Sequence, residues 1–329
     1  MQLSLDHPVV SSLVPVVLLI LVGVVTGKLQ LIRQEAVRDL TNLVFLVLTQ
    51  ALLFRTMSSV RVQELDFLPV WSYFAVAVTL FAAILLVLGT TSRAAVLALT
   101  GTFSNTVMIG IPLVGLAYGQ EGQVLLFTLI SLHALVLLTM ATVVLELLQA
   151  REQEREQARD QAQSGDAVQR HRLMTIVMAV KNAVVHPVPM PIIAGLLFAQ
   201  TGWTLPGLVD RPLLLLGNAF GPVALVLVGV TLAQVSIGRD FKGAMAIALI
   251  KTMLHPLLMA LAGWAFGLRG LSLTVLVVAA SLPVGANVFL FAYRYKKAEA
   301  LVTATVAVST LMALVSVTLV MMLIPLIAG

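Results

Sequence analysis

Ten apolar runs, most of them near the roughly 20 residues that a helix needs to cross the hydrocarbon core of a membrane, occupy most of this 329-residue chain. Sixty per cent of the residues are hydrophobic, 11% are charged and the mean hydropathy is +1.04, values outside the range of soluble domains. We therefore expect an all-α polytopic membrane protein in a lipid bilayer. The ten expected helices cover residues 9–31, 37–57, 68–88, 94–118, 124–148, 187–202, 212–235, 244–267, 271–293 and 301–326.

One long hydrophilic segment, residues 150–172, separates the first five expected helices from the last five. Its mixed charges at helical spacing predict a helix that continues into water, followed by a flexible linker. Because five is an odd number, the second half must enter the membrane from the opposite side. The sequence thus predicts a five-plus-five inverted repeat with two halves, residues 1–149 and 173–329, joined by a cytoplasmic linker.

The distribution of Lys and Arg predicts the orientation of the chain. If the N-terminus lies outside, the cytoplasmic segments hold fifteen of these residues and the external segments hold four. The positive-inside rule therefore places both termini outside. Because these basic residues sit in short loops between apolar runs, the net charge of +5 is an orientation signal, and we expect no nucleic-acid partner.

Two of the expected helices, the fourth and the ninth, are interrupted by Gly, Pro and small polar residues at matching positions. A Pro inside a membrane helix leaves backbone groups that only buried protein or a wet cavity can satisfy. Two such breaks in corresponding halves are typical of the substrate site of a transporter. The interrupting residues are Ser104, Asn105, Gly110 and Pro112 in the fourth helix, and Ser281, Pro283, Gly285 and Asn287 in the ninth.

These two interruptions predict an anion site. Half-helices that begin near Pro112 and Pro283 would point the positive ends of their dipoles at the middle of the membrane. Asn105 and Asn287 are the expected ligands, because an amide donates to a carboxylate without the cost of a buried charge. The alternative is that each motif is an ordinary kink in which the Asn only repairs the backbone.

Other polar residues inside the expected helices are further candidates. Asn42 and Gln50 in the second helix and Asn218 in the seventh would line the same cavity, or else would bond to neighbouring helices. His133 in the fifth helix is a candidate proton carrier, with a packing role as the alternative. Lys251 and His255 share one face of the eighth helix. We expect Lys251 to extend its ammonium toward the cytoplasmic surface, the alternatives being a counter-charge to substrate or a replacement for a bound cation.

Several chemistries are missing from the sequence. No Asp or Glu lies near the middle of an expected helix, which argues against proton coupling through a carboxylate. Sodium held by backbone carbonyl groups stays open, because such a site needs no acidic side chain. The chain has no Cys, and its five His residues form no cluster with metal-ligand spacing. We therefore expect no metal site, no cofactor and no enzymatic activity.

Three stretches resemble the auxin efflux carrier family of bacterial permeases and plant carriers: 103–113 with Tyr118 and Gly119, 222–233, and 283–287. The resemblance covers nearly the whole chain. It implies the ten-helix fold shared with bile acid sodium symporters, in which a transport domain moves against a scaffold and crossing helices four and nine hold the substrate. The His186-Pro187 opening of the sixth helix is similar to malonate-type bacterial permeases, where many relatives carry Asn-Pro, so His186 is a further candidate coupling residue.

Together these observations predict a secondary transporter of small organic anions, such as malonate, in a bacterial inner membrane with periplasmic termini. Alternating access would follow an elevator-like movement, with Na⁺ or H⁺ as the candidate coupling ion. A channel or a uniporter for weak-acid anions, such as auxin-like compounds, is the alternative. The sequence leaves the oligomeric state open, and a homodimer is one candidate.

Overall fold

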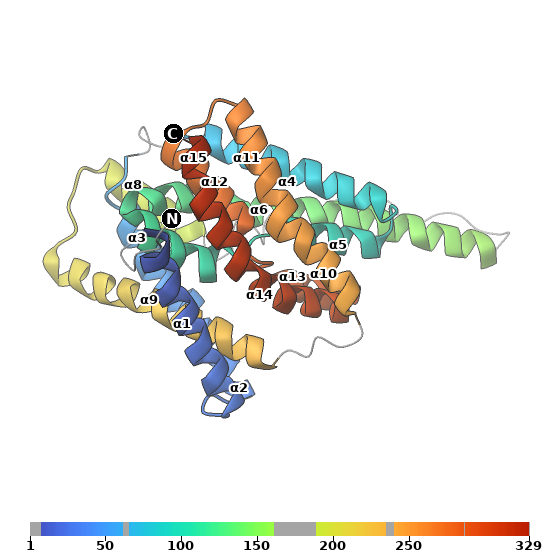
Figure 1. Ribbon diagram of the computed structural model, residues 1–329, viewed down its shortest axis with the longest axis horizontal. Coiled ribbons are helices and arrows are strands. Elements are labelled where there is room, and N and C mark those ends of the chain that lie inside the picture. The colour runs from blue at the N-terminus through green and yellow to red at the C-terminus, as the bar shows by residue number, and fades with distance from the viewer. Residues whose placement is uncertain (1–7, 62–65, 161–188, 235–239, 286, 329) are drawn as a thin grey trace.

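The computed structural model describes residues 8–61, 66–160, 189–234, 240–285 and 287–328, and these residues fold into helices (Figure 1). Seven helices in these ranges are long and apolar enough to cross a membrane, and two shorter apolar helices cover Met190–Gln200 and Gly270–Ser281. Within the same ranges the β-structure is limited to one isolated bridge. The prediction of a helical polytopic membrane protein is confirmed, whereas the count of ten helices and the inverted repeat stay predictions.

One set of helices, which we call the peripheral group, runs along the left side and the lower part of Figure 1, with α8 and α3 at the left and α9, α1 and α2 below them. The segments α2, η1 and α3 form one continuous rod, because the residues that join them keep helical backbone angles. The group comprises α1 (Pro8–Lys28), α2 (Gln34–Leu43), the π-helical turn η1 (Val44–Leu48), α3 (Thr49–Met57), α8 (Pro189–Gln200) and α9 (Gly207–Gln234).

Helices α1 and α9 make the most extensive helix pair of the peripheral group. A Cβ atom on Gly23 would collide with the carbonyl oxygen of Val226, and one on Gly229 would collide with that of Ile20. The two backbones therefore touch directly, which is the close approach that small residues permit between membrane helices. Gly195 of α8 likewise lies against the backbone of α3 at Phe54.

A second set of helices, the crossing group, contains the two interrupted helices predicted from the sequence. It packs around α12, which contacts α4, α6, α11 and α14. The group comprises α4 (Leu68–Val87), α5 (Ser92–Thr102), η3 (Thr106–Gly110), α6 (Ile111–Asp160), α10 (Phe241–Leu249), η4 (Ile250–Leu254), α11 (His255–Ala265), α12 (Gly270–Ser281), α13 (Asn287–Tyr295), α14 (Glu299–Leu323) and α15 (Pro325–Ala328).

Helix α6 consists of two helices joined at Gly119, whose positive φ of 61° marks a sharp bend. The bend lies where the sequence predicts the boundary between the fourth and fifth helices. The second part continues to Asp160, which confirms the predicted helical extension up to that residue. Residues 161–188, and with them His186 and the rest of the predicted linker, lie outside the described residues.

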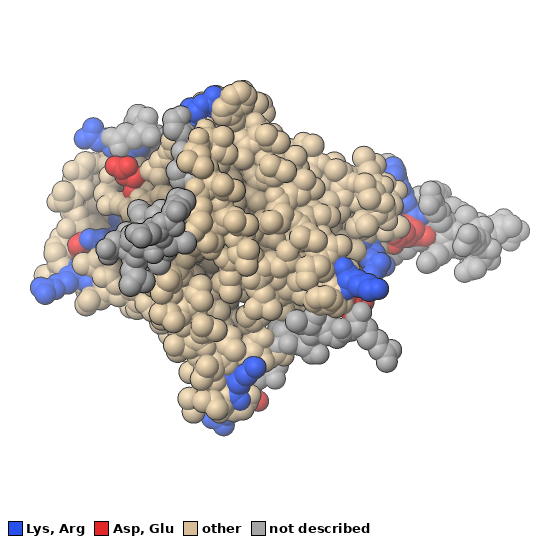
Figure 2. Space-filling model, viewed as in Figure 1, with Lys and Arg blue, Asp and Glu red and all other residues tan. Residues whose placement is uncertain are grey.

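Charged side chains lie at the margins of the face shown in Figure 2, and its broad middle is uncharged. Large hydrophobic side chains are exposed on many helices, including Leu18 on α1, Leu86 on α4 and Val315 on α14. A surface of this kind suits the lipid phase, where apolar side chains need no burial.

Candidate functional site: the crossing of two interrupted helices

The two interrupted helices pair with each other through their unwound backbones. Ser104 and Val284 form an antiparallel bridge. The amide of Asn105 donates to the carbonyl of Pro283 at 2.9 Å, and the amide of Gly285 donates to the carbonyl of Phe103 at 3.0 Å. The N–H and C=O groups of the unwound segments, which have no helical partners, are thus hydrogen-bonded inside the protein, as apolar surroundings require.

The half-helices begin at different residues from those that the sequence analysis predicted. Pro112 does not open the second half of its helix, because that half begins at Thr106 and Pro112 lies beyond the π-helical turn η3. Asn105 sets this start, since its side-chain oxygen accepts a hydrogen bond of 3.2 Å from the amide of Met108. Pro283 lies inside the other unwound segment, and α13 begins at Asn287. An Asn therefore stands at the start of each second half-helix.

Two glycines allow the unwound segments to approach each other. A Cβ atom on Gly285 would lie 2.8 Å from the ring of Phe103, and one on Gly110 would lie 2.8 Å from a methyl carbon of Leu282. Both distances are shorter than van der Waals contact. Gly110 and Gly285 are therefore needed for the close packing of the two segments, whichever ligand the crossing holds.

Helix α14 supports the second unwound segment through two serines. The amide of Val284 donates to the Ser309 hydroxyl at 3.1 Å, and the Ser316 hydroxyl lies 3.5 Å from the carbonyl of Ser281. Ser281 itself is buried and donates to the carbonyl of Val278. Ser309 and Ser316 are not among the residues predicted from the sequence, although their spacing of seven residues puts both on one face of an apolar helix.

Lys251 does not reach the membrane surface, so the predicted extension of its side chain toward water is wrong. The residue is 0% exposed, and its ammonium donates to the carbonyl oxygens of Ala280 at 2.6 Å and of Leu282 at 2.8 Å. The end of α12 leaves carbonyl groups without helical partners and carries a partial negative charge, which favours a cation there. Among the Lys, Arg, Asp and Glu side chains that the structure describes, Lys251 is the buried one.

A cluster of buried rings lies behind the crossing. The hydroxyl of Tyr73 is 2.9 Å from that of Ser104 and 3.5 Å from Nε2 of His133. His133 packs against Phe103 with 4.5 Å between ring centroids, and His255 packs against Tyr73 at 5.5 Å. The predicted residues His133 and His255 thus both lie near the crossing. Tyr73 was missed, although a Tyr in the second turn of an apolar helix was a signal.

Asn105 and Asn287 line one small cavity, together with Ser104, Gly285 and His133. Its volume of about 30 Å³ is enough for a water molecule but not for an organic anion. Phe45 of η1 is the one lining residue from the peripheral group, and all others come from the crossing group. The crossing is therefore too narrow for an organic anion in this structure, and Phe45 of the peripheral group forms part of its wall.

A larger cavity of about 1020 Å³ lies between the two groups and contains Pro112 and Asn218 in its lining. Asn42 and Gln50 line neither of these two cavities. Asn42 is exposed on α2, and the Gln50 side chain donates to the carbonyl of Phe45 beside the π-helical turn. The structure therefore brings Asn105 and Asn287 together and leaves Asn42, Gln50 and Asn218 outside the crossing.

Comparison with known proteins identifies the family of this chain. A family model described as membrane transport protein matches residues 8–321. Auxin efflux carrier component 8 of Arabidopsis thaliana is 25% identical over 239 residues, which cover 64% of this chain and 65% of the plant protein. A protein of Rhizobium meliloti (strain 1021) named "Putative malonate transporter" is 27% identical over 309 residues, 91% of each chain. The chain belongs to the auxin efflux carrier family of membrane transport proteins.

Proposed function

We propose that this protein is a secondary transporter of small organic anions, with mono- and dicarboxylates such as malonate as the leading class. The observation that carries the proposal is the pairing of the two unwound segments, which puts Asn105 and Asn287 at one cavity. The name of the similar Rhizobium protein supports malonate as the first compound to test.

The electrostatics of the crossing favour an anionic substrate. The second half-helices begin beside Asn105 and at Asn287, so the positive ends of two helix dipoles are close to the cavity. Lys251 adds a cation at the end of α12, where it binds the carbonyl groups of Ala280 and Leu282. Among the described residues, no Asp or Glu lines this cavity, so no carboxylate there would repel an anion.

Alternating access follows from movement of the crossing group against the peripheral group. The small cavity must widen before an anion fits, and Phe45 is the part of its wall that belongs to the peripheral group. An elevator-like shift would carry Asn105 and Asn287 past Phe45 while the backbone pairing between the unwound segments stays intact. Alternating access requires water on both sides of the membrane. We propose that this membrane is a bacterial inner membrane and that both termini of the protein are periplasmic.

Proton coupling, rather than sodium coupling, fits the crossing better. The carbonyl groups of Ala280, in the last turn of α12, and of Leu282, in the unwound segment, would hold sodium but already accept hydrogen bonds from Lys251. An ammonium at this position replaces the bound cation. His133, which lies within 3.5 Å of the Tyr73 hydroxyl, is the proposed proton carrier.

The test is transport by purified protein in proteoliposomes, screened with malonate and related carboxylates. Labelled substrate outside should exchange with excess unlabelled substrate inside, and an imposed pH gradient should drive uptake whereas a sodium gradient should not. Uptake without stimulation by substrate on the opposite side would instead indicate a channel. Dependence on sodium would contradict the coupling proposal alone.

A further inference from the structure

The larger cavity contains a second polar cluster, separate from the crossing. It lies between α3 and α9 on one side and the beginning of α6 on the other, with a volume of about 1020 Å³. Pro112 and Ile111, at the start of α6, form part of its lining, so the cavity reaches the helix that leads to Asn105. The small cavity shares no lining residue with it.

The charges in this cavity favour an anion. Two guanidinium groups, of Arg55 and Arg61, line it, and Asp210 is the one acidic residue in the lining. Arg55 binds Asp210 in a two-point ion pair, Nε to Oδ1 at 2.7 Å and Nη2 to Oδ2 at 3.1 Å. This pairing leaves Nη1 of Arg55 without a hydrogen-bond partner among the described residues, and the side chain is 33% exposed.

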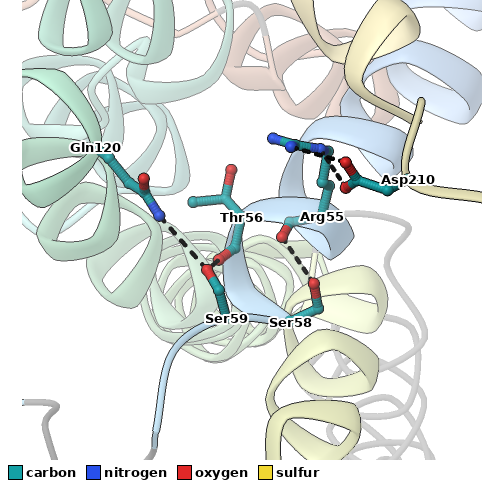
Figure 3. Close-up of polar contacts among 6 residues, drawn as sticks. All are labelled: Arg55, Thr56, Ser58, Ser59, Gln120 and Asp210. Carbon is teal, nitrogen blue, oxygen red and sulfur yellow. Dashed lines mark hydrogen bonds and ion pairs between the residues drawn. The ribbon is translucent and has the colours of Figure 1, made fainter. Parts of the chain in front are cut away.

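Neutral polar groups stand beside the ion pair. Figure 3 shows Gln120 approaching Thr56 and Ser59 from one side, while the Arg55–Asp210 pair lies on the other. The Gln120 amide lies 3.4 Å from the hydroxyl of Ser59, a contact between the crossing group and the peripheral group. The Ser59 hydroxyl already donates to the carbonyl of Thr56, so the Thr56 hydroxyl and the second N–H of the Gln120 amide are the donors here that a carboxylate could use.

We infer that Arg55 is an entry site that binds a carboxylate of the transported anion before the anion reaches the crossing. The inference rests on the proposed function. Asp210 holds the guanidinium in place and, by its negative charge, weakens the binding of the anion, so that the anion moves on toward α6. A planar guanidinium with a free edge suits a carboxylate, because it offers donors in a fixed geometry.

The alternative is a purely structural ion pair between α3 and α9. The two explanations differ in whether Asp210→Asn and Arg55→Gln change the KM in opposite directions. Asp210→Asn removes the charge that competes with substrate, and the entry site then predicts a lower KM. Arg55→Gln removes the binding group and should raise the KM about fivefold, which corresponds to roughly 1 kcal/mol. The maximal rate should change little in either variant, because neither residue lies at the crossing. A structural role predicts the same direction of change in both variants.

The KM is measured with substrate added on the side that carries Arg55, which is the periplasmic side in the proposed orientation, and, for comparison, on the opposite side. Arg211→Gln is the matched control, because Arg211 is exposed beside Asp210 but does not line the cavity. Arg55→Lys keeps the positive charge, so its KM should lie between those of wild type and Arg55→Gln. This variant also tests the entry site if Arg55→Gln folds poorly. Equal KM values for wild type, Arg55→Gln and Asp210→Asn would overturn the entry site. Because Asn105 variants test the crossing separately, that result would leave the proposed function standing.

Discussion

The ammonium of Lys251 lies 2.8 Å from the carbonyl oxygen of Leu282, inside the segment where α12 has unwound. Lys251 belongs to the π-helical turn η4 of a neighbouring helix, so one side chain joins two elements of the crossing group. A π-helical turn changes the direction of side chains along a helix and is frequent at functional sites. The crossing therefore depends on a cation that the chain itself provides.

Lys251→Met should abolish transport and lower the thermal unfolding midpoint. The substitution removes the charge and leaves the carbonyl groups of Ala280 and Leu282 without this donor. A buried polar group left without a hydrogen-bond partner typically costs about 1–3 kcal/mol. Differential scanning fluorimetry and uptake measure the two effects. Lys242→Met, an exposed control, should change neither. Wild-type uptake by Lys251→Met would show that the buried cation has no part in transport.

Gly285→Ala should weaken the crossing. The new methyl group would lie 2.8 Å from the Phe103 ring and 3.1 Å from the carbonyl oxygen of Ser104, so the two unwound segments must separate. We expect lower stability, by about 1–3 kcal/mol as for other overpacked sites, and reduced uptake. Gly207→Ala is the control, because a Cβ atom there meets nothing within 4 Å. Equal melting curves for the two variants would contradict the close approach.

The sequence was sufficient to identify the crossing but not its geometry. The interruptions at Ser104–Asn105 and Pro283–Gly285 were visible as polar and helix-breaking residues in apolar runs. The starts of the half-helices were misplaced because Pro was taken as the stronger signal, whereas side-chain capping by Asn105 begins the helix several residues earlier. Pairing of the two unwound backbones is a long-range contact, which no local pattern specifies.

Gly229→Val should destabilise the peripheral group. A side chain at this position would collide with the backbone of α1 at Ile20, and the contact of α1 with α9 would have to open. Because backbone atoms cannot move aside as side chains do, we expect a loss of about 1–3 kcal/mol or more. Thermal unfolding in detergent measures the change. A melting point equal to that of wild type would mean that the two helices are further apart than described.

Glu152→Ala should loosen the first turn of α5. The Glu152 carboxylate accepts hydrogen bonds from the amide and the hydroxyl of Ser92, both at 2.7 Å, and so caps the first turn of α5 from the extension of α6. Loss of a helix cap typically costs about 1 kcal/mol. Hydrogen exchange of the first turn of α5 should become faster. The exposed neighbour Arg151, changed to Ala, should leave that exchange unchanged.

Some functional candidates could not be judged from sequence at all. Lys251 was expected to reach water because it is long and lies two turns from a predicted helix end, but its partners on α12 are distant in sequence. Tyr73 and Ser309 gave only weak signals, since one polar group in an apolar helix is usual. Asn42 and Gln50 are polar residues in expected membrane helices, as Asn105 is, yet they lie away from the crossing. The sequence shows that a residue in a helix is polar, but not which neighbouring helix its side chain faces.

The most direct test of the anion site is uptake of the best carboxylate from the proteoliposome screen by Asn105→Ala and Asn287→Ala. Asn42→Ala is the control, since Asn42 is exposed on α2 and lines neither cavity. Loss of the amide donors should reduce the initial rate of uptake at least about tenfold in both crossing variants, equivalent to roughly 1.4 kcal/mol, with the control at the wild-type rate. Unchanged uptake by both Asn105→Ala and Asn287→Ala would contradict a substrate site at the crossing.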